Sequence, residues 1–168
     1  MNSGRCLIVL AAAAFVACAG AAPPKRLSTA EALTVTNSVR EFAATVADGV
    51  TRRGPQAWRD YFVDSPAFFM ASEGRLVFEN GDAATRGVQE LTRSITHIEL
   101  RWGEGLRVDP LSPTLAIMAA PWHELRVDAG GHRVEENGYF TALVEFSSLG
   151  WRFRDAHWSV TAAPSAVP

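Results

Sequence analysis

Cysteine is scarce in this sequence, and both of its cysteines, Cys6 and Cys18, fall near the amino terminus. A domain formed by the rest of the chain therefore has neither a disulfide nor a thiol nucleophile. Such a domain must be held together by buried apolar surface. A domain of roughly 140 residues can do this, since about two thirds of its unfolded surface leaves water on folding.

The chain also lacks a concentrated charge of either sign. Its 16 basic and 18 acidic residues give a net charge of −2, and the arginines occur singly or in pairs such as Arg52 and Arg53. Nucleic-acid binding needs a clustered basic patch that can neutralise phosphates. We therefore expect no nucleic-acid partner.

Several motifs of catalysis and metal binding are missing as well. The sequence has no GxSxG nucleophile elbow, no glycine-rich phosphate loop and no HxH or HExxH spacing. Its four histidines lie on separate segments of the chain: His97, His123, His132 and His157. We therefore predict no metal site and no cofactor.

The first 22 residues have the composition of a signal peptide, with a positive Arg5, an apolar stretch over 7–16 and small residues over 17–22. This stretch is shorter than the roughly 20 strongly apolar residues of a membrane-spanning helix. We expect its removal and an exported protein, periplasmic or secreted. The alternative is a lipoprotein leader that ends before Cys18, since residues 15–18 resemble a lipoprotein box, and lipid on Cys18 would then anchor the protein to a membrane.

Helical patterns follow. Ser28 and Glu31 have the spacing of a capping box, which predicts a helix start. Apolar residues then recur every three or four positions until Gly54, which can end the helix; they are Ala32, Val35, Val39, Phe42, Ala43, Val46 and Val50.

Two further helices and a hairpin are expected after Gly54. Pro55 can begin a short second helix, and residues 67–70 and 76–78 read as the strands of a hairpin. A third helix is predicted from an Asp82 cap to about Thr96. Its apolar positions are Val88, Leu91 and Ile95.

The rest of the chain is predicted to be extended, in four runs at 96–108, 114–127, 133–146 and 151–161. Runs of this length indicate a strongly bent sheet, with Gly103, Gly105, Pro121 and Gly138 as sites of bulges or kinks. The pattern predicts one α+β domain at 28–163, three helices packed on a curved, mostly antiparallel mixed sheet, with a linker at 23–27 and a tail at 164–168.

This order of elements resembles the SnoaL-like branch of the nuclear transport factor 2-like superfamily. The resemblance rests on the Trp58-x-x-Tyr61-Phe62 helix, residues 81–89, residues 138–141 and the closing segment 150–159, GWRFRDAHWS. It implies a cone-shaped cystatin-like fold whose wide end admits a small, often apolar ligand. Some relatives are isomerases, dehydratases or hydrolases, others only bind ligands, and many form homodimers through the outer face of the sheet.

Three ionisable residues are candidates for catalysis. Asp155 and His157 lie two apart on one strand, so the carboxylate could orient the imidazole. If Trp158 faces the cone, however, a regular strand turns His157 outward. Glu124 lies on the same side of a strand as Trp122. In a dry pocket beside that indole, the pKa of the Glu124 carboxyl would be raised, because the charged form would lose its contact with water.

Each candidate also has a purely structural interpretation. His157 could hydrogen-bond at a strand edge or dimer face, and Glu124 could lie at an exposed strand end. His97 and Glu99 form a second pair, which we expect to meet solvent or a partner subunit.

Aromatic residues are the remaining signal, and part of the set should line the cone because indoles suit apolar ligands. The predicted lining is Trp58, Tyr61, Trp102, Trp122 and Trp158.

The leading hypothesis is a homodimeric exported domain that binds a small apolar or amphipathic molecule. The alternatives are a cofactor-independent acid/base enzyme and a protein-interaction module.

Overall fold

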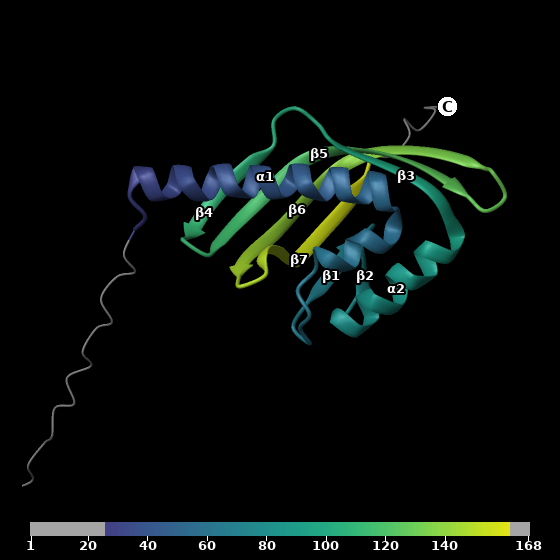
Figure 1. Ribbon diagram of the computed structural model, residues 1–168, viewed down its shortest axis with the longest axis horizontal. Helices are drawn as coiled ribbons and strands as arrows, with labels where there is room; N and C mark the ends of the chain where they lie inside the picture. Colours follow the sequence, from purple (N-terminus) through teal and green to yellow (C-terminus); the bar gives the residue numbers. More distant parts are fainter. Residues whose placement is uncertain (1–25, 162–168) are drawn as a thin grey trace, which may run out of the picture.

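A computed structural model describes residues 26–161, which form three helices on one side of an open, mixed β-sheet (Figure 1). The α+β class expected from the sequence is confirmed. The predicted signal peptide and Cys18 lie outside the described residues.

Helix α1, Thr29–Arg53, begins as the sequence predicts. Ser28 and Glu31 form a complete capping box, in which each side chain binds the other residue's backbone N–H. Gly54 ends the helix with a φ of 80°, which glycine adopts without a steric cost. The buried face of α1 packs against the strands β3 (Ile95–Trp102) and β4 (Arg107–Ser112).

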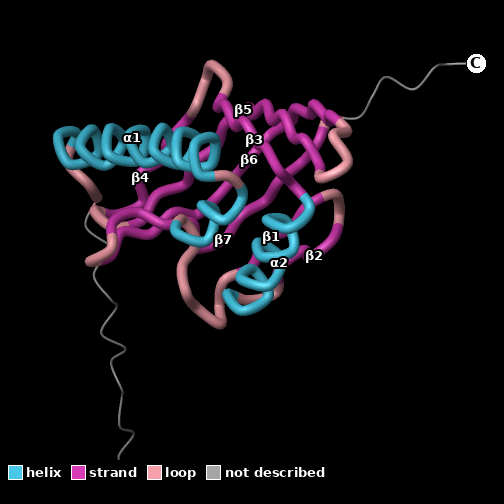
Figure 2. Tube along the Cα trace, turned by 45° about the vertical axis from the view of Figure 1, so that its right-hand side comes forward, coloured by secondary structure: helices cyan, strands magenta, loops and turns pink. Residues whose placement is uncertain are grey.

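The two shorter helices pack against each other beside α1 (Figure 2). The first, η1, is a 3₁₀ helix over Pro55–Asp60 with Pro55 in its first turn. The second, α2, spans Gly81–Ser94. The predicted Asp82 cap is wrong: the cap is Asn80, whose side-chain oxygen accepts a hydrogen bond from the N–H of Ala83 at 2.8 Å.

The sheet has the order β2-β1-β7-β6-β5-β3, with β4 paired to β5 as well. The predicted hairpin is present as β1, Phe69–Ser72, and β2, Arg75–Phe78. The long strands are β5 (Leu115–Asp128), β6 (Arg133–Ser147) and β7 (Gly150–Val160). Of the strand pairs within residues 26–161, β1–β7 is the parallel one, so the sheet is mixed and mostly antiparallel.

One predicted strand is in fact two. The run 96–108 breaks at residues 103–106 into β3 and β4, and both halves pair with β5. Gly103 follows β3 and donates a backbone hydrogen bond to the carbonyl of Pro121 at 2.8 Å. The break thus lies at a predicted kink site, but it separates two strands instead of bending one.

Gly138 is needed for a close approach between strands. A Cβ at this position would lie 1.8 Å from the carbonyl oxygen of Ser159 on β7, so β6 and β7 can pair here only around a glycine. The register shift between these strands lies elsewhere, at Leu143 and Val144. It changes which side chains of β7 point inward: Phe153 and Ala156 are both buried.

The core lies between α1, η1 and the concave face of the sheet. Its largest fully buried side chains include Phe68, Phe140 and Phe153. The same concave face continues past the core toward α2 and the β1–β2 hairpin. At that end, a cavity lies between the side chains of the sheet, α2 and the hairpin.

Candidate functional site

A cavity of about 260 Å³ lies between η1, α2, the β1–β2 hairpin and the concave face of the sheet. Its walls are mainly apolar and aromatic, and its ionisable lining comes from β5 alone. The lining residues are Trp58, Phe62, Met70, Ser72, Val77, Phe78, Val88, Leu91, Glu124, Arg126, Phe140 and Trp158. This combination of apolar walls with a few polar groups is typical of a small-molecule site.

A larger hollow of about 440 Å³ lies between residues 63–65 and the β6–β7 hairpin. Two of its lining carboxylates are already neutralised: Asp64 pairs with Arg59 at 2.9 Å, and Glu145 pairs with Arg154 at 3.4 Å. This hollow has no enclosed aromatic wall and no buried carboxylate. We therefore take the smaller cavity as the candidate site.

Glu124 is the one buried acidic or basic residue among those the structure describes, with 8% of its surface exposed. Its burial raises the pKa of the carboxyl from 4.5 to about 7, against the opposing effect of Arg126 and with a small further contribution from Glu136. Desolvation disfavours the charged carboxylate because the low-dielectric wall cannot replace water. Glu124 can therefore hold or release a proton near neutral pH.

Arg126 connects Glu124 to a second carboxylate. Its Nε lies 3.1 Å from Oε1 of Glu124, and its terminal NH₂ group pairs with Glu136. Glu124 and Glu136 are directly opposite each other on β5 and β6. Like charges at opposite positions destabilise a sheet, so the guanidinium between them offsets a repulsion that the strand register creates.

Comparison with known proteins addresses the fold. No protein-family model matches the chain, and no curated protein sequence is significantly similar to it. Solved structures do match. One is a nuclear transport factor 2-like superfamily protein from Salmonella enterica, with a TM-score of 0.61 and 13% identity over 82% of this chain and 95% of that one. This chain has the nuclear transport factor 2-like fold.

Two further structures with the same fold carry names of enzymes. A candidate scytalone dehydratase from Novosphingobium aromaticivorans has a TM-score of 0.68 and 12% identity, over 84% of this chain and 94% of its own. A hexachlorocyclohexane dehydrochlorinase has a TM-score of 0.61 and 14% identity, over 83% and 100%. At these identities the likeness establishes the fold and leaves the activity open.

Within the nuclear transport factor 2-like fold, two of the five predicted lining residues border the cavity. Trp58 on η1 and Trp158 on β7 face each other edge to face, with ring centroids 5.8 Å apart. The ring of Trp158 also lies 4.6 Å from that of Trp122 and 6.2 Å from that of Trp102. Trp158 thus joins Trp58, Trp102 and Trp122 into one cluster, of which the cavity touches one side.

The other three predicted lining residues have their polar atoms engaged outside the cavity lining. The indole of Trp122 donates to the carbonyl of Ser159 at 3.1 Å, and that of Trp102 donates to the carbonyl of Ala43 at 2.7 Å. The hydroxyl of Tyr61 donates to the carbonyl of Thr45 at 3.1 Å. These contacts fix the rings that support the cavity wall.

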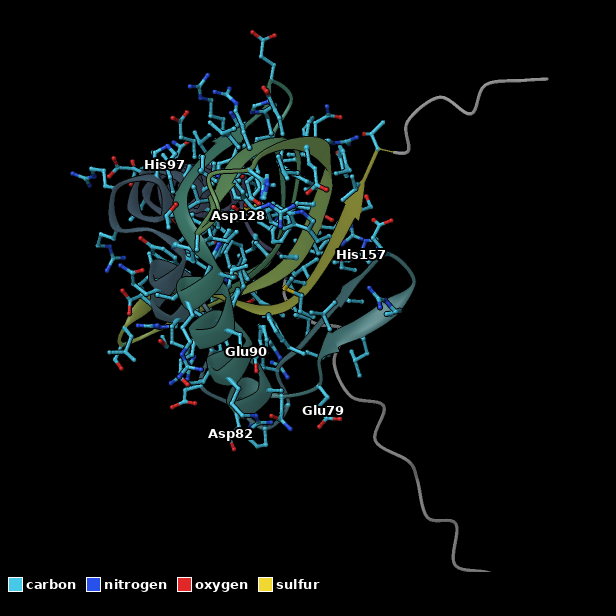
Figure 3. The ribbon with its side chains drawn as sticks, turned by 90° about the vertical axis from the view of Figure 1, so that its right-hand side faces the viewer. Glu79, Asp82, Glu90, His97, Asp128 and His157 are labelled. Carbon is cyan, nitrogen blue, oxygen red and sulfur yellow. The ribbon has the colours of Figure 1, made fainter. Side chains whose placement is uncertain are left out.

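Asp155 and His157 lie on the other side of β7. His157 is exposed at the outside of the strand (Figure 3), whereas Trp158 next to it points inward. Partial burial raises the pKa of Asp155, with Arg154 opposing and Glu145 adding to the shift. Among the described residues, no hydrogen bond joins Asp155 to His157, and neither of them lines the cavity around Glu124.

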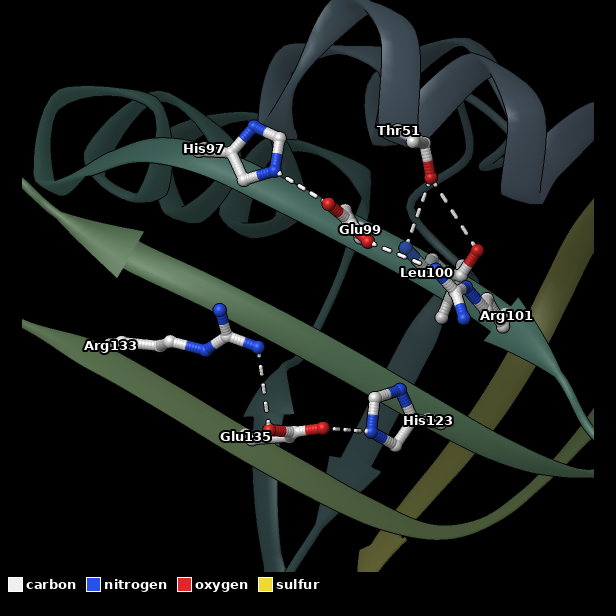
Figure 4. Close-up of polar contacts among 8 residues, drawn as sticks. All are labelled: Thr51, His97, Glu99, Leu100, Arg101, His123, Arg133 and Glu135. Atoms are coloured by element: carbon white, nitrogen blue, oxygen red, sulfur yellow. Dashed lines mark hydrogen bonds and ion pairs between the residues drawn. The ribbon is translucent and has the colours of Figure 1, made fainter.

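The outer face of the sheet carries its own polar pairs (Figure 4). His97 binds Glu99 at 3.1 Å, and this contact, with the help of Arg101, lowers the pKa of Glu99. His123 binds Glu135 across the strands at 2.8 Å. Within residues 26–161, no group of three or more side chains is arranged to hold a metal ion, and no helix has the length and apolarity of a membrane span.

Sequence reasoning missed Arg126 and Glu136. Arg126 follows Glu124 by two positions in a strand, so its presence on the same face could have been read from the alternation alone. The position of Glu136 beside Arg126 could not be read from the sequence, because it depends on the register between β5 and β6.

Proposed function

We propose that this chain binds a small, mostly apolar cyclic molecule in the cavity, with Glu124 as the polar group that fixes its orientation. The observation that carries the proposal is a nearly buried carboxyl on the wall of an otherwise apolar, aromatic cavity. A buried carboxylate is costly unless it is fully partnered. Glu124 shares the guanidinium of Arg126 with Glu136, and a bound molecule supplies a further partner. The volume of about 260 Å³ suits one ring or two fused rings.

Titration with 2-phenylethanol, followed by NMR of the side-chain methyl groups, tests the proposal. We expect saturable shifts at Met70, Val77, Val88 and Leu91, which line the cavity from β1, β2 and α2. The variant Leu91→Trp fills the cavity and should weaken binding at least tenfold. Leu33→Trp is the matched control, because Leu33 is 59% exposed on α1; equal binding by all three proteins would refute the proposal.

The second candidate is a cofactor-independent enzyme that moves a proton. It is favoured by the pKa of about 7 at Glu124, since a general base works best when its pKa is near the ambient pH. The named dehydratase and dehydrochlorinase with this fold are consistent with such chemistry. In this proposal Glu124 accepts the proton. The neutral acid no longer pairs with Arg126 Nε, which can then stabilise the negative charge that develops on the substrate.

Proton exchange from 2-indanone in D₂O, followed by NMR, tests the enzyme proposal without knowledge of the natural substrate. Wild type should accelerate exchange, Glu124→Gln should abolish the acceleration, and Glu135→Gln on the outer face should retain it. Asp155 and His157 remain the other proposed acid/base pair. Loss of exchange in His157→Ala with retention in Glu124→Gln would assign the chemistry to them.

We further propose that the protein is exported and homodimeric. Export rests on the composition of residues 1–22, with lipidation at Cys18 as the alternative, and the intact mass of the mature protein distinguishes the two.

The dimer is supported by exposed apolar side chains on the outer sheet face, including Ile117 and Tyr139. Ile117→Glu should lower the mass measured by sedimentation equilibrium from that of two chains to that of one.

A further inference from the structure

The charged groups at the cavity include more carboxylates than cations. Glu124 and Arg126 are its ionisable lining residues, and η1, α2, β1, β2, β6 and β7 contribute only uncharged side chains to the lining. Behind them, Glu136 on β6 shares the guanidinium of Arg126. One arginine thus faces two glutamates, so the group carries a net charge of −1 when both carboxyls are ionised.

The rest of the cavity wall offers aromatic rings. Trp58 stacks on Phe62 with centroids 5.9 Å apart, and Phe140 packs edge to face against Trp158 at 5.0 Å. All four rings line the same cavity as Glu124. The faces of such rings attract cations, and tryptophan does so most strongly.

We propose that the ligand of this cavity carries a protonated amine, which pairs with the carboxylate of Glu124 and lies against the rings of Trp58 and Trp158. This inference rests on the proposed function, that the cavity binds a small molecule, and adds the chemical class of that molecule. An ammonium group would neutralise the net charge of the three-residue group and give the buried carboxylate a second counter-ion beside the shared Arg126.

Other ligand chemistries fit less well. An anionic ligand would meet Glu124, while the guanidinium that could receive it is already bound to two carboxylates. A neutral ketone would need Glu124 in its protonated form, as a hydrogen-bond donor. Proton linkage therefore separates the two remaining cases: an amine favours the carboxylate and releases a proton, whereas a ketone favours the carboxylic acid and takes one up.

Calorimetric titration with 2-phenylethylamine and its neutral analogue 2-phenylethanol tests the proposal. The amine should bind at least tenfold more tightly than the alcohol at pH 7. Glu124 has a pKa of about 7 and is half protonated at this pH, so titrations in two buffers of different ionisation enthalpy should show release of about half a proton per amine bound.

Two variants locate the effect. Glu124→Gln keeps the shape of the side chain and should reduce amine affinity at least tenfold and abolish proton release. Glu135→Gln, next to the three-residue group but on the outer face and paired with His123, should behave as wild type.

The outcomes separate the two proposals. Equal binding of amine and alcohol, or amine binding that Glu124→Gln leaves unchanged, would overturn the amine class while the cavity function stands. Proton uptake in place of release would do the same. Failure of both compounds to bind would overturn the amine proposal together with the proposed function.

Discussion

Glu124→Gln should make the folded protein more stable at neutral pH, and the gain should vanish in acid. Burial raises the pKa of this carboxyl from 4.5 to about 7, so the folded chain holds the Glu124 proton more tightly than the unfolded chain does. Between these two pH values the folded state binds more protons, and the free energy of unfolding falls as the pH rises. Stability from the protonated group is complete below pH 4.5 and lost above pH 7.

The magnitude follows from the difference between the two pKa values. Each tenfold difference in proton affinity corresponds to 1.36 kcal/mol, so ionised Glu124 costs the folded state about 3 kcal/mol above pH 7. Glutamine has nearly the same shape and no charge to desolvate, and Arg126 keeps its pairing with Glu136. Relative to wild type, the free energy of unfolding of the variant should therefore rise by about 1.4 kcal/mol for each pH unit between 5 and 7.

Urea denaturation at pH 4.5, 5.5, 6.5 and 8.0 measures this difference, with the five tryptophans as the fluorescence signal. A change in packing alone would shift the two stability curves by a constant amount, whereas the charge effect changes their separation with pH. Parallel curves from pH 4.5 to 8.0 would refute the reasoning. Glu135→Gln, on the exposed outer face, should run parallel to wild type.

Three further substitutions test the fold. Ser28→Ala removes the capping box of α1 that Ser28 forms with Glu31 and should cost about 1 kcal/mol in urea denaturation; no loss would show that the cap is dispensable. Phe153→Ala removes a fully buried ring and should cost about 3–5 kcal/mol, and a cost below about 1 kcal/mol would contradict the core assignment. Gly138→Ala places a Cβ 1.8 Å from the backbone oxygen of Ser159 and should lower Tm more than Gly105→Ala, which has open space around its Cβ but a positive φ; the reverse order would contradict the close approach.

Much of the fold was predictable because its signals are local. The capping box at Ser28 and the terminating glycine at Gly54 fix α1 through contacts within three or four residues. The cap of α2 was placed wrongly because Asn80 and Asp82 are both suitable residues, and only the hydrogen bond to Ala83 distinguishes them. The break between β3 and β4 depends on the pairing of both with β5, which no local pattern records.

The site was predictable only in part, since it depends on which strands meet and in which register. Alternation along β5 placed Glu124 on the same side as Trp122, but it could not show that α2 and the β1–β2 hairpin would cover that end of the strand. The partnership of Arg126 with Glu136 depends on the pairing of β5 with β6 at Glu124 and Glu136. On β7 the register shift near Phe153 resets the inward positions, so the side toward which Trp158 points could not be read from alternation alone.

The energetics of Glu124 connect the fold to the proposed site. A carboxyl that costs the folded state about 3 kcal/mol above pH 7 does not improve packing, since glutamine fills the same space without that cost. Arg126 offsets the desolvation of Glu124 only in part, because Glu136, directly across the sheet, shares its guanidinium and repels the ionised Glu124 carboxylate. Residues that reduce stability in the apo form are expected where a ligand or a reaction uses them. If the amine proposal holds, saturating 2-phenylethylamine should recover much of this cost, and the bound wild type should then approach Glu124→Gln in stability at pH 8.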